Sequence, residues 1–214
     1  MAPTSLHTIP SEVMWSADTL KIARWTTTEA DDWPGRTVLT VMLQGCPWSC
    51  TTCETPELSN PFTPGALDWQ EVRTVIQRSR SGLDGVVFSG GEPTRQDGLA
   101  DAMEQVRAMG LPVGLHTSGS YPQRLAAVLS LADRVVLEIK APATLYSVVT
   151  GVGASAHKAF ASLRLALDAG VDLQVRTLAD GAVISAEALE GLKANLAAMG
   201  VHDHVVVEVG GPAS

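Results

Sequence analysis

Residues 85–119 read GVVFSGGEPTRQDGLADAMEQVRAMGLPVGLHTSG, and this stretch predicts the fold. An apolar run at 85–88 is followed by a helical stripe at 99–109, a stop at Gly110 and a second apolar run at 112–115. Short runs that are apolar nearly throughout are typical of strands buried on both faces of a parallel sheet. Glycine after the last periodic residue is a common helix stop. The stretch therefore predicts one strand–helix–strand unit.

The same alternation continues in both directions along the chain. Further strands are expected at residues 37–43, 134–139, 171–175 and 204–209, and further helices at 69–76, 125–132, 160–167 and 189–199. Six strands alternating with helices predict right-handed crossovers and a parallel sheet. Six are too few for the closed eight-stranded barrel. We expect an α/β fold, an open partial (β/α)6 barrel; the pattern alone leaves a doubly wound open sheet as the alternative.

Length and composition indicate one globular domain. The chain has 214 residues, of which 45% are hydrophobic and 18% charged, with a net charge of −8. We expect an N-terminal extension, residues 1–31, that packs on a domain formed by residues 32–214. The acidic balance argues against nucleic-acid or membrane binding, which depends on Lys and Arg. Neither a bilayer-spanning apolar stretch nor a secretory signal is visible, so a cytoplasmic location is expected.

The three cysteines of the chain, Cys46, Cys50 and Cys53, fall within eight residues. A disulfide scaffold would distribute an even number along the chain, whereas clustered thiols indicate a metal or an iron–sulfur cluster. A cubane held by three thiolates would leave one iron open to another ligand. The spacing alone leaves two alternatives: inert cysteines with a Cys50–Cys53 disulfide, or zinc. The fourth zinc ligand would be one of the histidines, namely His7, His116, His157, His202 or His204.

Unusual polar residues lie at the end of each of the first five predicted strands or directly after it. The cysteine loop follows the first, and the others are Gly90, Gly91 and Glu92, then His116, Thr117 and Ser118, then Glu138 and Lys140, and finally Arg176. Chemistry in parallel α/β folds gathers at the carboxyl ends of the strands, which share one edge of the sheet. Two glycines there allow a ligand close to the backbone, and the carboxylate after them could accept hydrogen bonds from an ammonium group. The sequence therefore predicts one active site.

C-x3-C-x2-C after the first strand, together with Gly-Gly-Glu-Pro after the second, resembles the radical S-adenosylmethionine (SAM) superfamily. The resemblance runs from about Asp32 to Glu208. Within the superfamily the chain looks most like the short activating enzymes of anaerobic ribonucleotide reductases. The supporting segments are residues 32–35, 44–46, 55–58, 116–120 and 138–142.

The resemblance implies a role for each motif position. Cys46, Cys50 and Cys53 would bind three irons of a [4Fe–4S] cluster, and the amino and carboxylate groups of SAM would chelate the fourth. The residues expected to hold the methionine amino group are Gly90, Gly91 and Glu92. Those expected at the carboxylate or ribose are Thr117, Ser118, Lys140 and Arg176. In related activases acidic residues matching His116 and Glu138 help hold a monovalent cation, and here Glu138 alone is acidic.

Two positions of the cysteine loop depart from the family pattern. Thr52 stands where the family usually has an aromatic residue beside the adenine, and Glu54 stands where close relatives carry histidine. Thr52 and the nearby aromatic Trp48 are therefore the candidates for the adenine end of SAM. Three other tryptophans, Trp15, Trp25 and Trp33, are expected to pack or cap, and His202 and His204 to be structural or solvated.

The implied function is that of an anaerobic oxidoreductase. A reduced cluster would cleave SAM to methionine and a 5′-deoxyadenosyl radical, which would abstract hydrogen from a glycine of a glycyl-radical enzyme partner. A reduced flavodoxin or a ferredoxin-type protein would supply the electron. The alternatives are a radical SAM enzyme acting on a small metabolite or peptide, and a non-enzymatic zinc or redox module.

Overall fold

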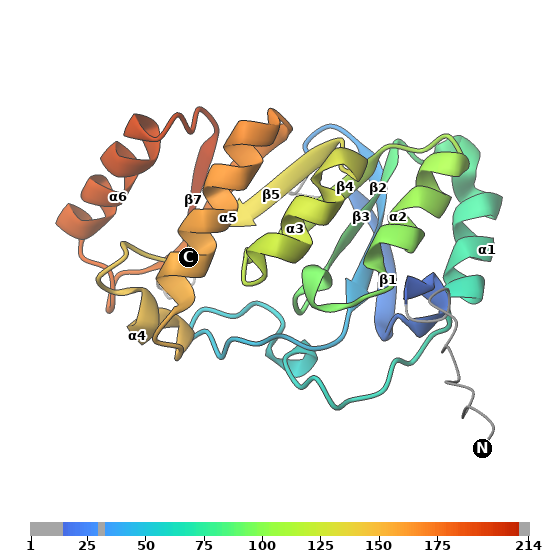
Figure 1. Ribbon diagram of the computed structural model, residues 1–214, viewed down its shortest axis with the longest axis horizontal. Coiled ribbons are helices and arrows are strands. Elements are labelled where there is room, and N and C mark those ends of the chain that lie inside the picture. Colours follow the sequence, from blue (N-terminus) through green and yellow to red (C-terminus); the bar gives the residue numbers. More distant parts are fainter. Residues whose placement is uncertain (1–14, 30–32, 210–214) are drawn as a thin grey trace, which may run out of the picture.

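The computed structural model describes residues 15–29 and 33–209 (Figure 1). Its strands are β1 (Ile22–Glu29), β2 (Thr37–Leu43), β3 (Gly85–Gly90), β4 (Val113–Thr117), β5 (Arg134–Glu138), β6 (Asp172–Asp180) and β7 (His204–Val209). Its α-helices are α1 (Trp69–Ser79), α2 (Leu99–Ala108), α3 (Pro122–Val128), α4 (Tyr146–Thr150), α5 (Ser155–Ala169) and α6 (Ala186–Ala198). Short 3₁₀ turns are η2 (Ala17–Thr19), η3 (Pro56–Leu58), η4 (Arg80–Gly82), η5 (Pro93–Arg95) and η6 (Leu129–Leu131). All six predicted strands and all five predicted helices are present.

The strands form one sheet in the order β1-β2-β3-β4-β5-β6-β7. Pairing is parallel from β2 to β7, and β1 runs antiparallel to β2. Every parallel strand thus lies beside its predecessor, so the crossovers advance in one direction, whereas a doubly wound sheet reverses its strand order. The two outer strands, β1 and β7, do not pair within the described residues. The open partial-barrel expectation is confirmed.

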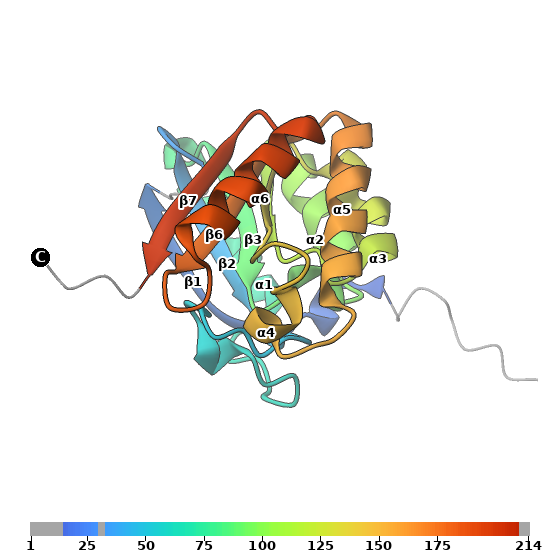
Figure 2. The same cartoon turned by 90° about the vertical axis from the view of Figure 1, so that its left-hand side faces the viewer.

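The larger helices cover the outer side of the curved sheet (Figure 2). The core between them is built from apolar runs of the strands and one stripe of each helix, and its largest fully buried side chains include Trp69, Tyr146 and Phe88. The expected ends are observed: Asp68 N donates to Glu71 Oε2 at 3.0 Å where α1 begins, and Gly170 ends α5 with φ +66°. At the end of the sheet far from the cysteine loop, buried Trp33 lies against Gly85 and Gly114.

Strand β1 and helix α4 were not expected from the sequence. β1 is an edge strand, and its Trp25 side chain is 36% exposed. Because an edge strand is not buried on both faces, its sequence lacks the continuous apolar run that marks a buried strand. Helix α4 has five residues, too few for helical periodicity to register. Trp15 and Trp25 are exposed rather than packed. The predicted boundary between residues 31 and 32 lies outside the described residues, as does His7.

Among residues 15–29 and 33–209, no helix combines the length and apolar character needed to cross a membrane.

Candidate active site

The cysteine loop between β2 and η3 is held by backbone hydrogen bonds at its start and in its middle. At its start, Gly45 N donates to Leu58 O at 2.7 Å and Cys46 N donates to Ser59 O at 2.9 Å. In its middle, Ser49 N and Thr51 N donate to carbonyls of helix α4, Thr150 O at 3.0 Å and Val149 O at 2.9 Å. The unexpected helix α4 therefore serves as the platform for the three thiols.

The turn after β3 is joined directly to the start of the cysteine loop. Gly91 N donates to Leu43 O at 2.8 Å and Glu92 N donates to Gly45 O at 2.9 Å. A Cβ on Gly91 would lie 2.5 Å from Gly45 O, which is backbone and cannot swing away. Gly90 has φ +107°, a conformation that favours glycine. The two glycines thus let the two loops touch and leave the turn's backbone open to the cavity.

Glu92 is fully buried and saturated with internal hydrogen bonds. Its Oε1 accepts from Thr94 N at 3.0 Å, from the Thr94 hydroxyl and from Thr117 Oγ1 at 2.7 Å. Its Oε2 accepts from Ser118 N at 2.8 Å and from the Ser118 hydroxyl. The carboxylate therefore ties the turn after β3 to the end of β4. It is not among the residues that line the cavity described below.

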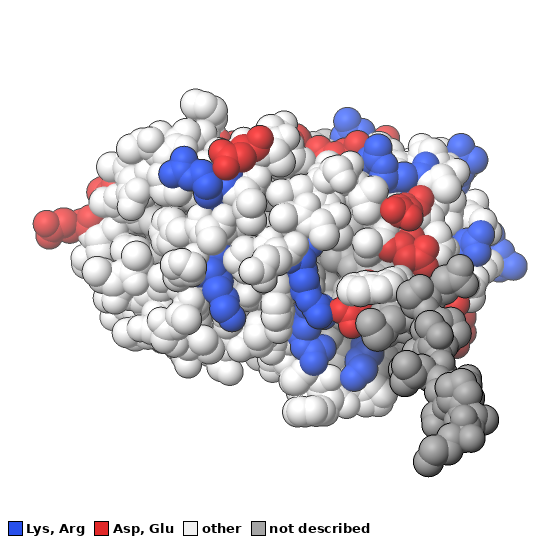
Figure 3. All heavy atoms as spheres, in the orientation of Figure 1, with Lys and Arg blue, Asp and Glu red and all other residues white. Residues whose placement is uncertain are grey.

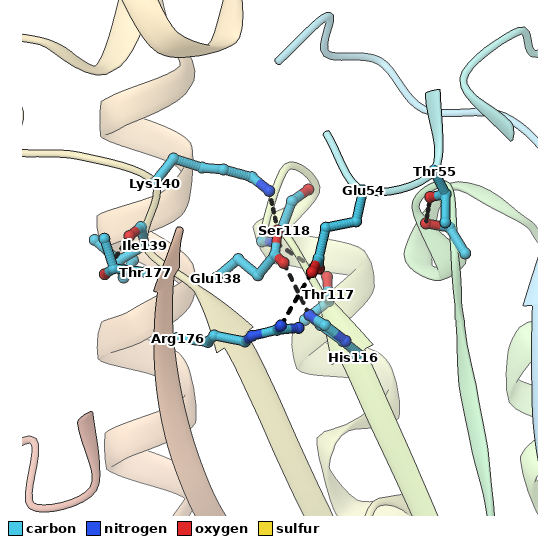
Figure 4. Close-up of polar contacts among 12 residues, drawn as sticks. Glu54, Thr55, His116, Thr117, Ser118, Glu138, Ile139, Lys140, Arg176 and Thr177 are labelled. Carbon is cyan, nitrogen blue, oxygen red and sulfur yellow. Dashed lines mark hydrogen bonds and ion pairs between the residues drawn. The ribbon is translucent and has the colours of Figure 1, made fainter. Parts of the chain in front are cut away.

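Five charged or titratable side chains meet at the carboxyl ends of β4, β5 and β6 (Figure 4). Glu138 contacts His116 Nε2 at 3.1 Å and forms an ion pair with Lys140. Arg176 Nη2 lies 3.1 Å from Glu54 Oε1, so this ion pair bridges β6 to the residue after Cys53. Glu138, His116 and Lys140 are nearly buried, whereas the Glu54 side chain is 48% exposed. The polar centre is thus internally paired, and Glu54 marks its rim.

These groups line a cavity of about 470 Å³ at the predicted edge of the sheet. Most of the sequence-predicted site residues line it: Cys46, Trp48, Cys50, Cys53, Gly90, Gly91, Thr117, Ser118, Glu138, Lys140 and Arg176. Glu92 and Thr52 do not. The sequence analysis missed Thr26, Thr40, Met42 and Leu178, which also line it. For Thr40 and Met42 the signal was available, because residues two apart on a strand share a face. Thr26 and Leu178 lie on strand regions that were not predicted.

The three thiols are free, and burial raises the pKa of two of them. Desolvation raises the pKa of Cys46 to about 12, and it raises that of Cys50 while the charge of Lys140 opposes the shift. Without a bound cation these groups are therefore neutral at pH 7. Thiolates form here when a strongly positive group replaces the protons, as in metal binding. Cys53 is exposed at the rim.

Trp48 and Thr52, the candidates for the adenine end, have different surroundings. Trp48 is 3% exposed, lines the cavity and packs edge-on against Tyr146, with ring centroids 5.9 Å apart. Thr52 is 8% exposed, and its hydroxyl oxygen has no hydrogen-bond partner among the described residues. A buried hydroxyl without a partner is uncommon and calls for an additional group.

The described residues fit a cubane cluster and its nucleotide. One loop supplies three sulfur ligands to one cavity, two glycines expose backbone beside them, and Lys140 adds a cation. Three thiolates leave one iron of a cubane without a protein ligand. Within residues 15–29 and 33–209, no three His, Cys, Asp or Glu side chains are grouped as ligands of a single metal ion.

The Radical SAM superfamily profile matches residues 40–181, and the chain belongs to this superfamily. Its cofactors are therefore a [4Fe–4S] cluster and SAM. No match was found among curated protein sequences.

Solved structures with the same fold include Streptococcus suis SuiB bound to its precursor peptide SuiA, with a TM-score of 0.64 and 16% identity over 80% of this chain and 38% of that one. Native anSMEcpe with bound SAM gives 0.63 and 17% over 77% and 49%. QueE from Escherichia coli gives 0.50 and 15% over 88% and 92%. The chain thus spans less than half of SuiB and anSMEcpe, and these identities show the fold alone.

Proposed function

We propose that this radical SAM enzyme acts on a polypeptide, and specifically that it installs a glycyl radical on a partner resembling anaerobic ribonucleotide reductase. When bound, the reduced cluster would supply reductive cleavage of SAM to methionine and a 5′-deoxyadenosyl radical that abstracts a hydrogen atom. The protein would supply orientation and exclusion of water.

The observation that carries the polypeptide proposal is the open rim beside the third cysteine. Cys53 is exposed and the Glu54 side chain is 48% exposed, although the rest of the polar centre is buried. A carbon radical needs a site closed to solvent. A substrate that is itself large, such as a protein loop, can close this rim on docking. SuiB, which shares the fold, has been crystallised with its precursor peptide.

The proposed roles follow the cavity. Cys46, Cys50 and Cys53 hold the cluster, and the backbone of Gly90 and Gly91 faces the methionine amino group. The carboxylate and ribose would meet Thr117, Ser118, Lys140 and Arg176, and the adenine would meet Trp48. Thr52 does not line the cavity, and it stays a candidate for the adenine end because its buried hydroxyl has no partner among the described residues. Glu92 contributes by positioning Thr117 and Ser118, to which it is hydrogen-bonded.

The proposal is tested by mixing the reconstituted enzyme, SAM and a reductant with a glycyl-radical partner under anaerobic conditions. We expect 5′-deoxyadenosine in the solution and a glycyl-radical signal on the partner by electron paramagnetic resonance. Nucleoside without a protein radical would contradict the glycyl-radical assignment.

A second candidate is a radical SAM enzyme for a small metabolite or peptide. The Glu54–Arg176 ion pair favours it, because a short substrate with its own carboxylate could take the place of Glu54 at the guanidinium. Nucleoside formation that is stimulated by such a compound, with no protein radical, would support this candidate.

A further inference from the structure

A basic surface patch lies beside the cysteine loop of a protein whose net charge is −8. The patch consists of Lys21, Arg95, Arg124 and Lys158. Figure 3 shows Lys and Arg side chains gathered in the lower middle of one face, in the area where Figure 1 draws the cysteine loop and the start of α3. Charge of one sign on one face of an oppositely charged protein indicates a binding surface.

The start of the cysteine loop belongs to this patch. Lys21 Nζ donates to Pro61 O at 3.1 Å. Pro61 and Arg95 both lie against Gly45: a Cβ built there would be 2.9 Å from Pro61 Cα and 3.2 Å from Arg95 Nη1. Gly45 directly precedes Cys46. Arg95 thus reaches the residue before the first thiol, and Lys21 binds Pro61, which lies against the same residue.

The other half of the patch continues from Arg95 without a break. The Arg124 guanidinium donates to Arg95 O, and it lies over the Tyr121 ring, 5.5 Å from the centroid. Lys158 Nζ lies over the same ring at 6.0 Å. Arg95, Arg124 and Lys158 are therefore connected through Arg95 O and the Tyr121 ring, and Lys21 joins them through Pro61 beside Gly45.

Most of this positive charge is uncompensated. Arg124 pairs with Asp97 at 2.8 Å, whereas Lys21, Arg95 and Lys158 have no carboxylate partner in the part of the chain that the structure describes. Phe62, next to Pro61, is 88% exposed. An exposed aromatic side chain among unpaired cations has the composition of a protein interface.

We propose that the basic patch is the docking site for an acidic one-electron carrier protein. This inference rests on the proposed function, because SAM cleavage requires one electron at the cluster. The chain has three cysteines, all in one loop, so it has no thiolates for a second cluster that could relay the electron. The carrier loses one electron and the cluster gains it, with no transfer of atoms.

The position of the patch suits this partner. It contacts the loop at Gly45, before the first thiol, whereas the open rim lies at Cys53 and Glu54, after the third. A carrier at one end of the loop would leave the rim to the substrate. Single-stranded DNA could also use these cations through its phosphates and stack on Phe62, so its binding is measured beside that of the carrier. The contact with the loop of the three thiols favours the carrier, because an electron must be delivered close to the cluster.

The test uses the reconstituted enzyme and a purified flavodoxin, an acidic carrier. The patch variant is Lys21→Glu/Lys158→Glu, with Lys158→Glu alone as a milder version that breaks no hydrogen bond of Lys21. The control is Arg78→Glu/Arg80→Glu, which changes the charge equally at the end of α1, at the opposite edge of the sheet. Flavodoxin affinity is measured by fluorescence anisotropy, and cluster reduction by loss of visible absorbance, with flavodoxin hydroquinone or dithionite as reductant.

At low ionic strength we expect the patch variant to bind flavodoxin at least about tenfold more weakly than the unmodified enzyme. We expect flavodoxin to reduce its cluster at least about tenfold more slowly, because charge complementarity mainly accelerates encounter. The difference should shrink at high salt, and reduction by dithionite should not change. Equal binding and reduction by flavodoxin in patch and control variants would overturn the proposal. The proposal would also be overturned if the patch variant bound flavodoxin as well as the control variant does but lost binding of single-stranded DNA in the same anisotropy assay. Because cluster reduction is measured without SAM, failure to form 5′-deoxyadenosine would count against the proposed function and not against the docking site.

Discussion

Replacing Glu92 with glutamine should destabilise the protein even when no cofactor is bound. The carboxylate is fully buried and accepts hydrogen bonds from five donors, three on Oε1 and two on Oε2. In Glu92→Gln an amide NH₂ group replaces one oxygen and faces donors. If it replaces Oε2, the Ser118 hydroxyl can rotate to accept, but Ser118 N–H loses its acceptor.

The size of the effect follows from these contacts. A buried donor left unsatisfied costs about 1–3 kcal/mol, and hydrogen bonds to a charged acceptor are stronger by about 1 kcal/mol than those to a neutral one. Removing the charge also relieves some desolvation, which offsets part of the loss. We expect Glu92→Gln to lower the free energy of unfolding by about 2–3 kcal/mol.

The assay is urea unfolding of the cluster-free protein, followed by circular dichroism. The matched control is Glu54→Gln, which removes an exposed partner of Arg176 and should cost less than about 1 kcal/mol. If Glu92 served solely as a ligand contact, the cluster-free variant would unfold like the unmodified protein. Equal unfolding free energies for Glu92→Gln and Glu54→Gln would therefore refute the positioning role.

Three further predictions concern backbone contact and protons. Gly91→Ala should separate the two loops, because its Cβ would meet Gly45 O at 2.5 Å, and should lower both thermal stability and iron content, whereas Gly153→Ala, with open space around it, should change neither. The affinity for iron should rise with pH, because burial raises the pKa of Cys46 to about 12 and the thiol must release its proton to bind. The rise should be up to about tenfold per pH unit for each thiol that releases a proton. Iron and sulfide content after reconstitution at pH 7 and at pH 8.5 measures this effect. Burial and the charge of Lys193 lower the pKa of His204 below its usual 6.5, so folding favours the neutral imidazole. The stability that this group contributes is therefore present above pH 6.5 and is lost as the pH falls below it. We expect His204→Gln to flatten the acid side of a curve of Tm against pH.

The sequence predicts the parallel strands because a strand buried on both faces needs consecutive apolar residues, which are visible in the sequence. Val86, Val87 and Phe88 are apolar in succession, and all three are buried in β3. Strand β1 shows the limit of this signal. With β2 on one side and no further described strand on the other, it needs no apolar run, and its threonines read as loop. The missing strand also hid Thr26, which lines the cavity.

The location of the site could also be predicted, since the order and direction of the strands bring five loops to one edge of the sheet. What spacing cannot give is the direction of a side chain. Glu92 follows two cavity-lining glycines, yet its carboxylate turns to Thr94, Thr117 and Ser118 instead of the cavity. This outcome depends on a hydroxyl donor at the end of β4 and an amide donor directly after it, 25 and 26 residues away, and no local pattern encodes it.

The two departures of the cysteine loop acquire separate physical meanings in three dimensions. Glu54 contacts Arg176, 122 residues further along the chain. The glutamate at this position therefore introduces an ion pair across the rim, and its carboxylate is one that a substrate would have to accommodate or displace. Thr52 has the opposite character: it is buried, and its hydroxyl has no partner among the described residues. One position is thus satisfied within the protein and the other is not. Since an unsatisfied buried hydroxyl is costly, we expect the bound nucleotide or cluster to supply the missing hydrogen bond of Thr52, and Glu54, at the exposed rim, to act on the substrate side.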